Sequence, residues 1–102
     1  MSTHRIAIAI APDHPAFAGH FPGRPIVPGV LLLDLAQREI EASTGLRLQA
    51  LATVKFLSPV LPGQPLTLAF EVDAGQVRFE CLRDTQAVAK GRFITTGGEA
   101  RA

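Results

Sequence analysis

PGVLLLDLAQREIEAS, residues 28–43, is the stretch that decides the fold of this 102-residue chain. Pro28 and Gly29 are suited to open a helix, and Gly45 is suited to end it. About fifteen residues at 1.5 Å each predict a helix of roughly 22 Å. Its first half is apolar on every side except at Asp34, so we expect that half to be buried. Its second half turns polar and is expected to emerge into solvent.

The other periodic segments of the chain predict strands. Large and small residues alternate over residues 5–10, which is typical of a strand with one face on a core. After the helix, apolar residues alternate again over four segments, at residues 46–56, 66–72, 77–81 and 87–95. Short turns rich in Gly, Pro, Asp and Gln separate these four segments. This order predicts an α+β fold in which an antiparallel sheet covers one long helix.

Length and composition bound the rest. We expect one domain over residues 1–96 and a disordered tail over residues 97–102. A net charge of +1 implies neither a nucleic-acid partner nor a membrane surface. Cys81 is the single cysteine and falls at an apolar position of a predicted strand, which favours a buried hydrophobe over a nucleophile. We expect a cytoplasmic protein without a transmembrane segment.

Asp34 and His20 are the residues that suggest chemistry. A carboxylate among leucines is costly to bury unless another group pairs with it or uses it. His20 lies fourteen residues upstream, and the intervening segment is stiffened by Pro22, Pro25 and Pro28. The pattern predicts a site that holds an acid and a base in fixed geometry.

Simpler interpretations remain open at this point. His20 alone is compatible with an ordinary loop histidine. Asp34 alone is compatible with a structural residue that pairs with Arg38, four residues further along the helix.

Two motifs resemble those of the hotdog-fold 3-hydroxyacyl-[acyl-carrier-protein] dehydratases. Residues 20–29, HFPGRPIVPG, match the family's His-Phe-Pro-Gly-x-Pro-x-x-Pro-Gly block, and Asp34 is the acidic residue five positions later. Residues 55–65, KFLSPVLPGQP, are similar to the family's Phe-x-x-Pro-Val-x-Pro-Gly-Asp segment. The chain departs from the pattern at Arg38, where the family often has Gln. The resemblance implies a hotdog fold, an antiparallel sheet wrapped around one long central helix.

The resemblance also implies a reaction, the dehydration of 3-hydroxyacyl thioesters to trans-2-enoyl thioesters in fatty acid or related acyl-chain biosynthesis. His20 suits the base that removes the C2 proton, because its unperturbed pKa lies near neutrality. Asp34 suits the acid that protonates the departing hydroxyl or orients the water that leaves.

Further roles come from the same resemblance. The backbone amide of Gly29, at the helix N-terminus, is the expected oxyanion donor. The carbonyl of Ile26 is expected to orient the histidine ring. The expected substrate-binding residues are Phe21, Pro28 and Leu33.

The implied partner is an acyl carrier protein, whose phosphopantetheine carries the acyl thioester substrate. No cofactor of the protein's own and no metal are expected. Arg24, Lys55 and Arg92 are candidate contacts to an acidic carrier, although scattered basic residues are usually only solvated. The family places the histidine and the acid of one site on different subunits, so we expect a homodimer or higher oligomer.

Two alternatives stay open. One is a hotdog acyl thioesterase, in which water attacks the thioester; the intact His-Phe-Pro-Gly and Pro-Gly blocks argue against it. The other is a non-catalytic acyl-binding partner subunit.

Overall fold

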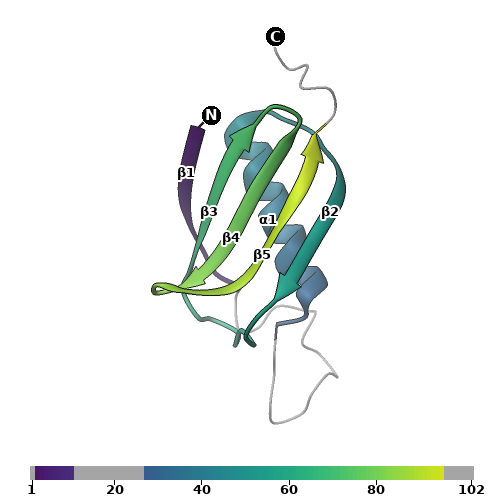
Figure 1. The fold of residues 1–102 in the computed structure, drawn as a ribbon. Helices are drawn as coiled ribbons and strands as arrows, with labels where there is room; N and C mark the ends of the chain where they lie inside the picture. Colours follow the sequence, from purple (N-terminus) through teal and green to yellow (C-terminus); the bar gives the residue numbers. More distant parts are fainter. Residues whose placement is uncertain (1, 11–26, 96–102) are drawn as a thin grey trace.

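The structure, a computed structural model, describes residues 2–10 and 27–95. It contains five strands and one helix over these residues (Figure 1). The elements follow one another as β1 (Ser2–Ile8), α1 (Gly29–Thr44), β2 (Leu48–Phe56), β3 (Leu66–Asp73), β4 (Gln76–Arg83) and β5 (Gln86–Thr95). The predicted helix and strands are confirmed in type and order. The first strand begins three residues earlier than expected, because every residue from Ser2 to Ile8 pairs with β3.

The five strands form one antiparallel sheet in the order β1-β3-β4-β5-β2. Its centre is the meander β3-β4-β5, and β1 and β2 form the two edges. Helix α1 lies against one face of this sheet (Figure 1). The predicted α+β architecture, an antiparallel sheet that covers one helix, is therefore confirmed.

The core lies between α1 and the inner face of the sheet. Leu32, Ala36 and Ile40 form the buried stripe of the helix, at the spacing of four that places residues on one face. Residues of the central strands complete the core, alternate ones on β3 and β4 and an irregular set on β5: Leu66, Leu68, Phe70, Val77, Phe79, Cys81, Val88, Ala89 and Phe93.

One prediction about α1 is wrong. Its first half is not buried on every side, because the side chain of Val30 is 75% exposed and Asp34 is also exposed. The reason is geometric, since the sheet of a single chain covers only one face of the helix.

Both ends of α1 are fixed by backbone contacts. The carbonyl of Pro28 accepts hydrogen bonds from the amides of Leu31 at 3.0 Å and Leu32 at 3.2 Å. At the other end Gly45 is left-handed, with φ of 75°, and its amide donates to the carbonyl of Glu41 at 2.9 Å. The predicted cap at Gly45 is confirmed, because this conformation is strained for residues with a Cβ.

Candidate active site

Asp34 lies on the second turn of α1, and its side chain is 51% exposed. The Nε atom of Arg38, itself 75% exposed, lies 3.1 Å from the Oδ2 atom of Asp34. The ion pair between Asp34 and Arg38, which the sequence allowed as a simpler explanation for Asp34, is therefore present. An exposed pair at this spacing contributes only about 0.3–0.5 kcal/mol, so stabilisation is a weak reason for a carboxylate within a run of leucines.

Asp34 faces a hollow between α1 and the edge strand β2. The hollow has a volume of about 310 Å³, at the lower end of the range for small-molecule sites. Asp34 is the single charged group among the residues that line it: Val30, Leu33, Asp34, Gln37, Leu48, Gln49, Ala50, Leu51 and Phe93. One carboxylate thus meets a mainly apolar space, and the predicted substrate-binding residue Leu33 lines the same space.

Gly29 begins α1, at the end where helical N–H groups lack intrahelical acceptors. The aromatic ring of Phe56, at the end of β2, packs over it: a Cβ on Gly29 would lie 2.6–2.9 Å from three ring atoms. Only glycine permits this approach without displacement of the ring. Sequence reasoning assigned no role to Phe56, although the signal was present, because it is the aromatic residue of the second motif.

Three predicted site residues, His20, Phe21 and Ile26, lie outside the described residues. Their roles, like those of Gly29 and Asp34, stay predictions. Pro28 is described and serves as the N-cap of α1. The structure thus brings Leu33 and Asp34 to one hollow and places Pro28 and Gly29 at the adjoining helix start.

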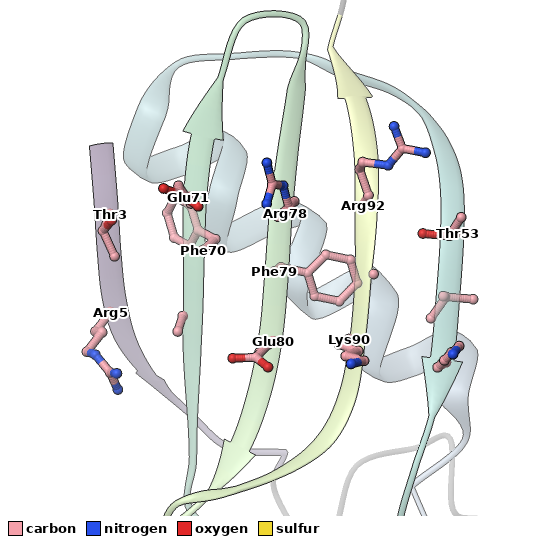
Figure 2. A pocket seen from close by; sticks show the side chains of 14 residues that line it. Thr3, Arg5, Thr53, Phe70, Glu71, Arg78, Phe79, Glu80, Lys90 and Arg92 are labelled. Atoms are coloured by element: carbon pink, nitrogen blue, oxygen red, sulfur yellow. The ribbon is translucent and has the colours of Figure 1, made fainter. Parts of the chain in front are cut away.

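A larger hollow, of about 630 Å³, lies on the face of the sheet opposite α1. Figure 2 shows its charged side chains standing on the strands in front of the helix. Arg78 lies opposite Arg92, and Lys55 lies opposite Lys90, so like charges face each other across neighbouring strands. The hollow contains neither Asp34 nor Gly29, and we therefore place the candidate active site at the smaller one. Lys55 and Arg92 both line this outer face, and their contact with a carrier stays a prediction.

Cys81 is a free, buried cysteine on β4, as predicted. Burial raises the pKa of its thiol to about 12, which excludes a thiolate nucleophile near neutral pH. Within the part of the chain that the structure describes, no three His, Cys, Asp or Glu residues gather as metal ligands. No helix of residues 2–10 and 27–95 is long and apolar enough to cross a membrane.

Comparison with protein families adds the decisive observation. Residues 1–92 match the model of the ApeI-like family, described as ApeI dehydratase. The chain belongs to the ApeI-like dehydratase family. The predicted resemblance to hotdog-fold dehydratases is confirmed at the level of family.

Relatives of known name agree with this assignment. A 3-hydroxyacyl-[acyl-carrier-protein] dehydratase FabZ of Chlamydia trachomatis is 34% identical over 97 residues, which cover 79% of this chain and 63% of that protein. The FabZ of Mannheimia succiniciproducens is 41% identical over 73 residues, covering 62% of this chain and 49% of that protein. The chain thus spans from about half to less than two thirds of the length of these relatives.

Solved structures confirm the hotdog fold. The dehydratase heterocomplex ApeI:P from Xenorhabdus doucetiae superposes with a TM-score of 0.79 at 27% identity, covering 91% of this chain and 86% of that chain. The R-hydratase PhaJ1 of Pseudomonas aeruginosa gives a TM-score of 0.66 at 17% identity, covering 94% of this chain and 79% of that one. At this lower identity the second likeness concerns the fold alone.

Proposed function

We propose that this protein dehydrates 3-hydroxyacyl thioesters, carried on an acyl carrier protein, to trans-2-enoyl thioesters. The observation that carries the proposal is the lone carboxylate of Asp34, which faces an apolar hollow one turn beyond the helix start at Gly29. Membership of a dehydratase family and the FabZ relatives support the same reaction. The lone cysteine, which forms no internal disulfide, suits a reducing compartment such as the cytoplasm.

The reaction needs one base and one acid. His20 removes the proton from C2, and the electron pair of that C–H bond forms the C2–C3 double bond. The C3–O bond breaks, and the hydroxyl leaves as water with a proton that Asp34 donates or delivers through an ordered water. Atoms and charge balance without an oxidant, so the chain needs no cofactor of its own.

The helix start stabilises charge in this scheme. Removal of the C2 proton places negative charge on the thioester oxygen, and the amide of Gly29 donates to it at the positive end of the helix dipole. The ring of Phe56 packs on Gly29 at this end of the helix. Ile26 orients the imidazole of His20 through its carbonyl, and Phe21, Pro28 and Leu33 contact the acyl chain.

A second copy of the chain completes the site in this proposal. Strand β2 is an edge of the sheet, and most of its residues are exposed. Large apolar side chains are exposed on β2 and on α1 beside it, with Leu51 39%, Phe56 51% and Val30 75% exposed. Pairing of β2 with β2 of a second copy covers these side chains and continues the sheet. His20 of one chain then faces Asp34 of the other.

One assay tests the reaction. The protein is incubated with a 3-hydroxyacyl acyl carrier protein, and the acyl-carrier products are resolved by mass spectrometry. We expect an enoyl product, identified by loss of one water. Free 3-hydroxy acid instead of the enoyl product indicates a thioesterase, and no conversion despite binding indicates a non-catalytic subunit; either result contradicts the proposal.

A further inference from the structure

We propose that Arg83 is a positioning residue of the candidate active site. It holds the turn formed by residues 58–64, called here the anchor turn, and this turn fixes both ends of the segment that carries His20. The effect of Arg83 on catalysis rests on the proposed dehydration. The structural part, that Arg83 holds the anchor turn, is independent of it.

The anchor turn contacts both ends of the segment between β1 and α1. The amide of Gly63 donates to the carbonyl of Ile10 at 2.7 Å, and the amide of Val27 donates to the carbonyl of Val60 at 2.8 Å. Ile10, Val27 and Val60 are each buried in the common core. Val60 and Gly63 are three residues apart, so about 11 Å of chain at most separates the two anchor points. In the sequence, residues 11–26 with His20 run between Ile10 and Val27.

The anchor turn has a defined conformation. Pro62 and Gly63 occupy its central positions, Gly63 has φ of 81°, and the amide of Gln64 donates to the carbonyl of Leu61 at 3.2 Å. Proline followed by a left-handed glycine is typical of a type II turn. The side-chain oxygen of Gln64 also accepts a hydrogen bond from the amide of Leu61 at 2.9 Å. The turn is therefore closed by its own backbone and by one side chain.

Arg83, the last residue of β4, binds the anchor turn from the adjoining hairpin. Its Nη1 atom donates to the carbonyl of Pro59 at 2.9 Å and to Oε1 of Gln64 at 3.5 Å. Its Nη2 atom donates to Oγ of Ser58 at 3.1 Å and to Oε1 of Gln86 at 3.3 Å. Three of these four acceptors belong to the anchor turn. A planar guanidinium reaches several acceptors in one fixed geometry, which a lysine ammonium does not reproduce.

The contacts continue from the anchor turn to the helix start. Val27, held by Val60, precedes Pro28, and the carbonyl of Pro28 receives the first hydrogen bonds of α1. Displacement of the turn therefore moves the amide of Gly29 as well as the ends of the His20 segment. Arg83 itself does not line the hollow at Asp34. Its effect on the site is thus indirect, through the turn.

The test uses Arg83→Met, which removes the donors while it keeps a long side chain. The matched control is Arg78→Met, on the same strand, because the exposed side chain of Arg78 makes no hydrogen bond or ion pair within the described residues. Amide hydrogen exchange of Val27 and Gly63 reports on the anchor turn. Steady-state kinetics with a 3-hydroxyacyl carrier protein report on the site.

For Arg83→Met we expect faster exchange at both amides and a fall in kcat of about 10- to 100-fold, with KM nearly unchanged, because the reacting groups are misplaced. Gln64→Met, which removes an acceptor of Arg83 and also the bond to the amide of Leu61, is expected to shift the same amides in the same direction. Arg83→Lys should restore part of both effects, and Arg78→Met should change neither.

Unchanged exchange at Val27 and Gly63 in Arg83→Met overturns the structural part. Faster exchange with wild-type kcat overturns the positioning role. A wild-type protein that dehydrates no 3-hydroxyacyl thioester overturns the proposed function instead, and the exchange measurement still decides whether Arg83 holds the turn. If Arg83→Met does not fold, Arg83→Lys supplies the comparison, because Gln64→Met also removes the bond between Gln64 and the amide of Leu61.

Discussion

Two features beside Asp34 offer different explanations for a carboxylate at this position. One is the ion pair with the guanidinium of Arg38, and the other is the apolar hollow beside β2. The ion pair is solvated on both sides, so its loss costs little stability. The hollow, in contrast, places the carboxylate beside a mainly apolar space, which is the environment that the proposed reaction requires. Variants at these two residues distinguish a chemical role from a structural one.

We expect Asp34→Asn to lower kcat by at least about 10²-fold, because the amide keeps the shape but supplies no acidic proton. The free energy of unfolding should change by less than about 1 kcal/mol. Asp34→Glu should keep part of the activity. Steady-state kinetics and urea unfolding measure both quantities.

Arg38→Ala is the control for this prediction, since it breaks the same ion pair and keeps the carboxylate. It should retain activity close to that of the wild type. If Asp34→Asn is as active as the wild type, or if Arg38→Ala loses as much activity, the carboxylate has a structural role.

Cys81 gives a prediction about stability at high pH. Burial raises the pKa of its thiol from 9.0 to about 12, so the folded chain keeps a proton that the unfolded chain loses. This contribution to stability is fully present below pH 9 and is lost as the pH rises towards 12. Between these values we expect the free energy of unfolding to fall by about 1.4 kcal/mol per pH unit from this group.

The measurement is urea unfolding at several alkaline pH values for the wild type and for Cys81→Ala. The variant has no thiol, so the wild type should show the steeper loss of stability with pH. Equal pH dependence of the two proteins would show that Cys81 is not protected by burial.

At the scale of elements, the edge strand β2 and the adjacent face of α1 carry the large apolar side chains that a single chain leaves exposed to solvent. Strand β1, the other edge, carries the small or polar exposed residues Thr3, Arg5 and Ala7, whereas β2 and the adjacent face of α1 expose Leu51, Phe56 and Val30. This asymmetry between the edges favours β2 as the strand that pairs with a second copy.

We expect Leu51→Lys to dissociate the dimer, because it places a charge in the apolar surface beside β2 without removing a buried side chain. Thr3→Lys, on the opposite edge strand, is the matched control and should leave the dimer intact. Sedimentation velocity measures the assembly of each variant. A Leu51→Lys protein that stays dimeric, or a monomeric wild type, would contradict pairing through β2.

The elements themselves were predictable because their signals are local. Alternation of apolar residues located β3 to β5, and Gly45 located the end of α1. The exposure of Val30 was not predictable. An apolar residue on a helix gives the same sequence pattern whether the sheet of its own chain or a second chain covers it. The hydrogen bonds of Arg83 to the anchor turn join residues about twenty-five positions apart, and no sequence period reports such contacts.

At the scale of the whole molecule, the proposed reaction depends on two copies of the chain. The hollow at Asp34 opens beside the edge at which the second copy is expected to pair. If His20 and Asp34 of one site belong to different chains, defects in the two residues complement each other when subunits are mixed.

The most direct measurement is dehydration by mixed His20→Ala and Asp34→Asn subunits after proven subunit exchange. Each variant alone should be inactive. Random exchange makes half of the dimers heterodimers with one intact pair each, so we expect about a quarter of the wild-type sites to recover. No recovery after complete exchange would show that His20 and Asp34 do not act together across the subunit interface.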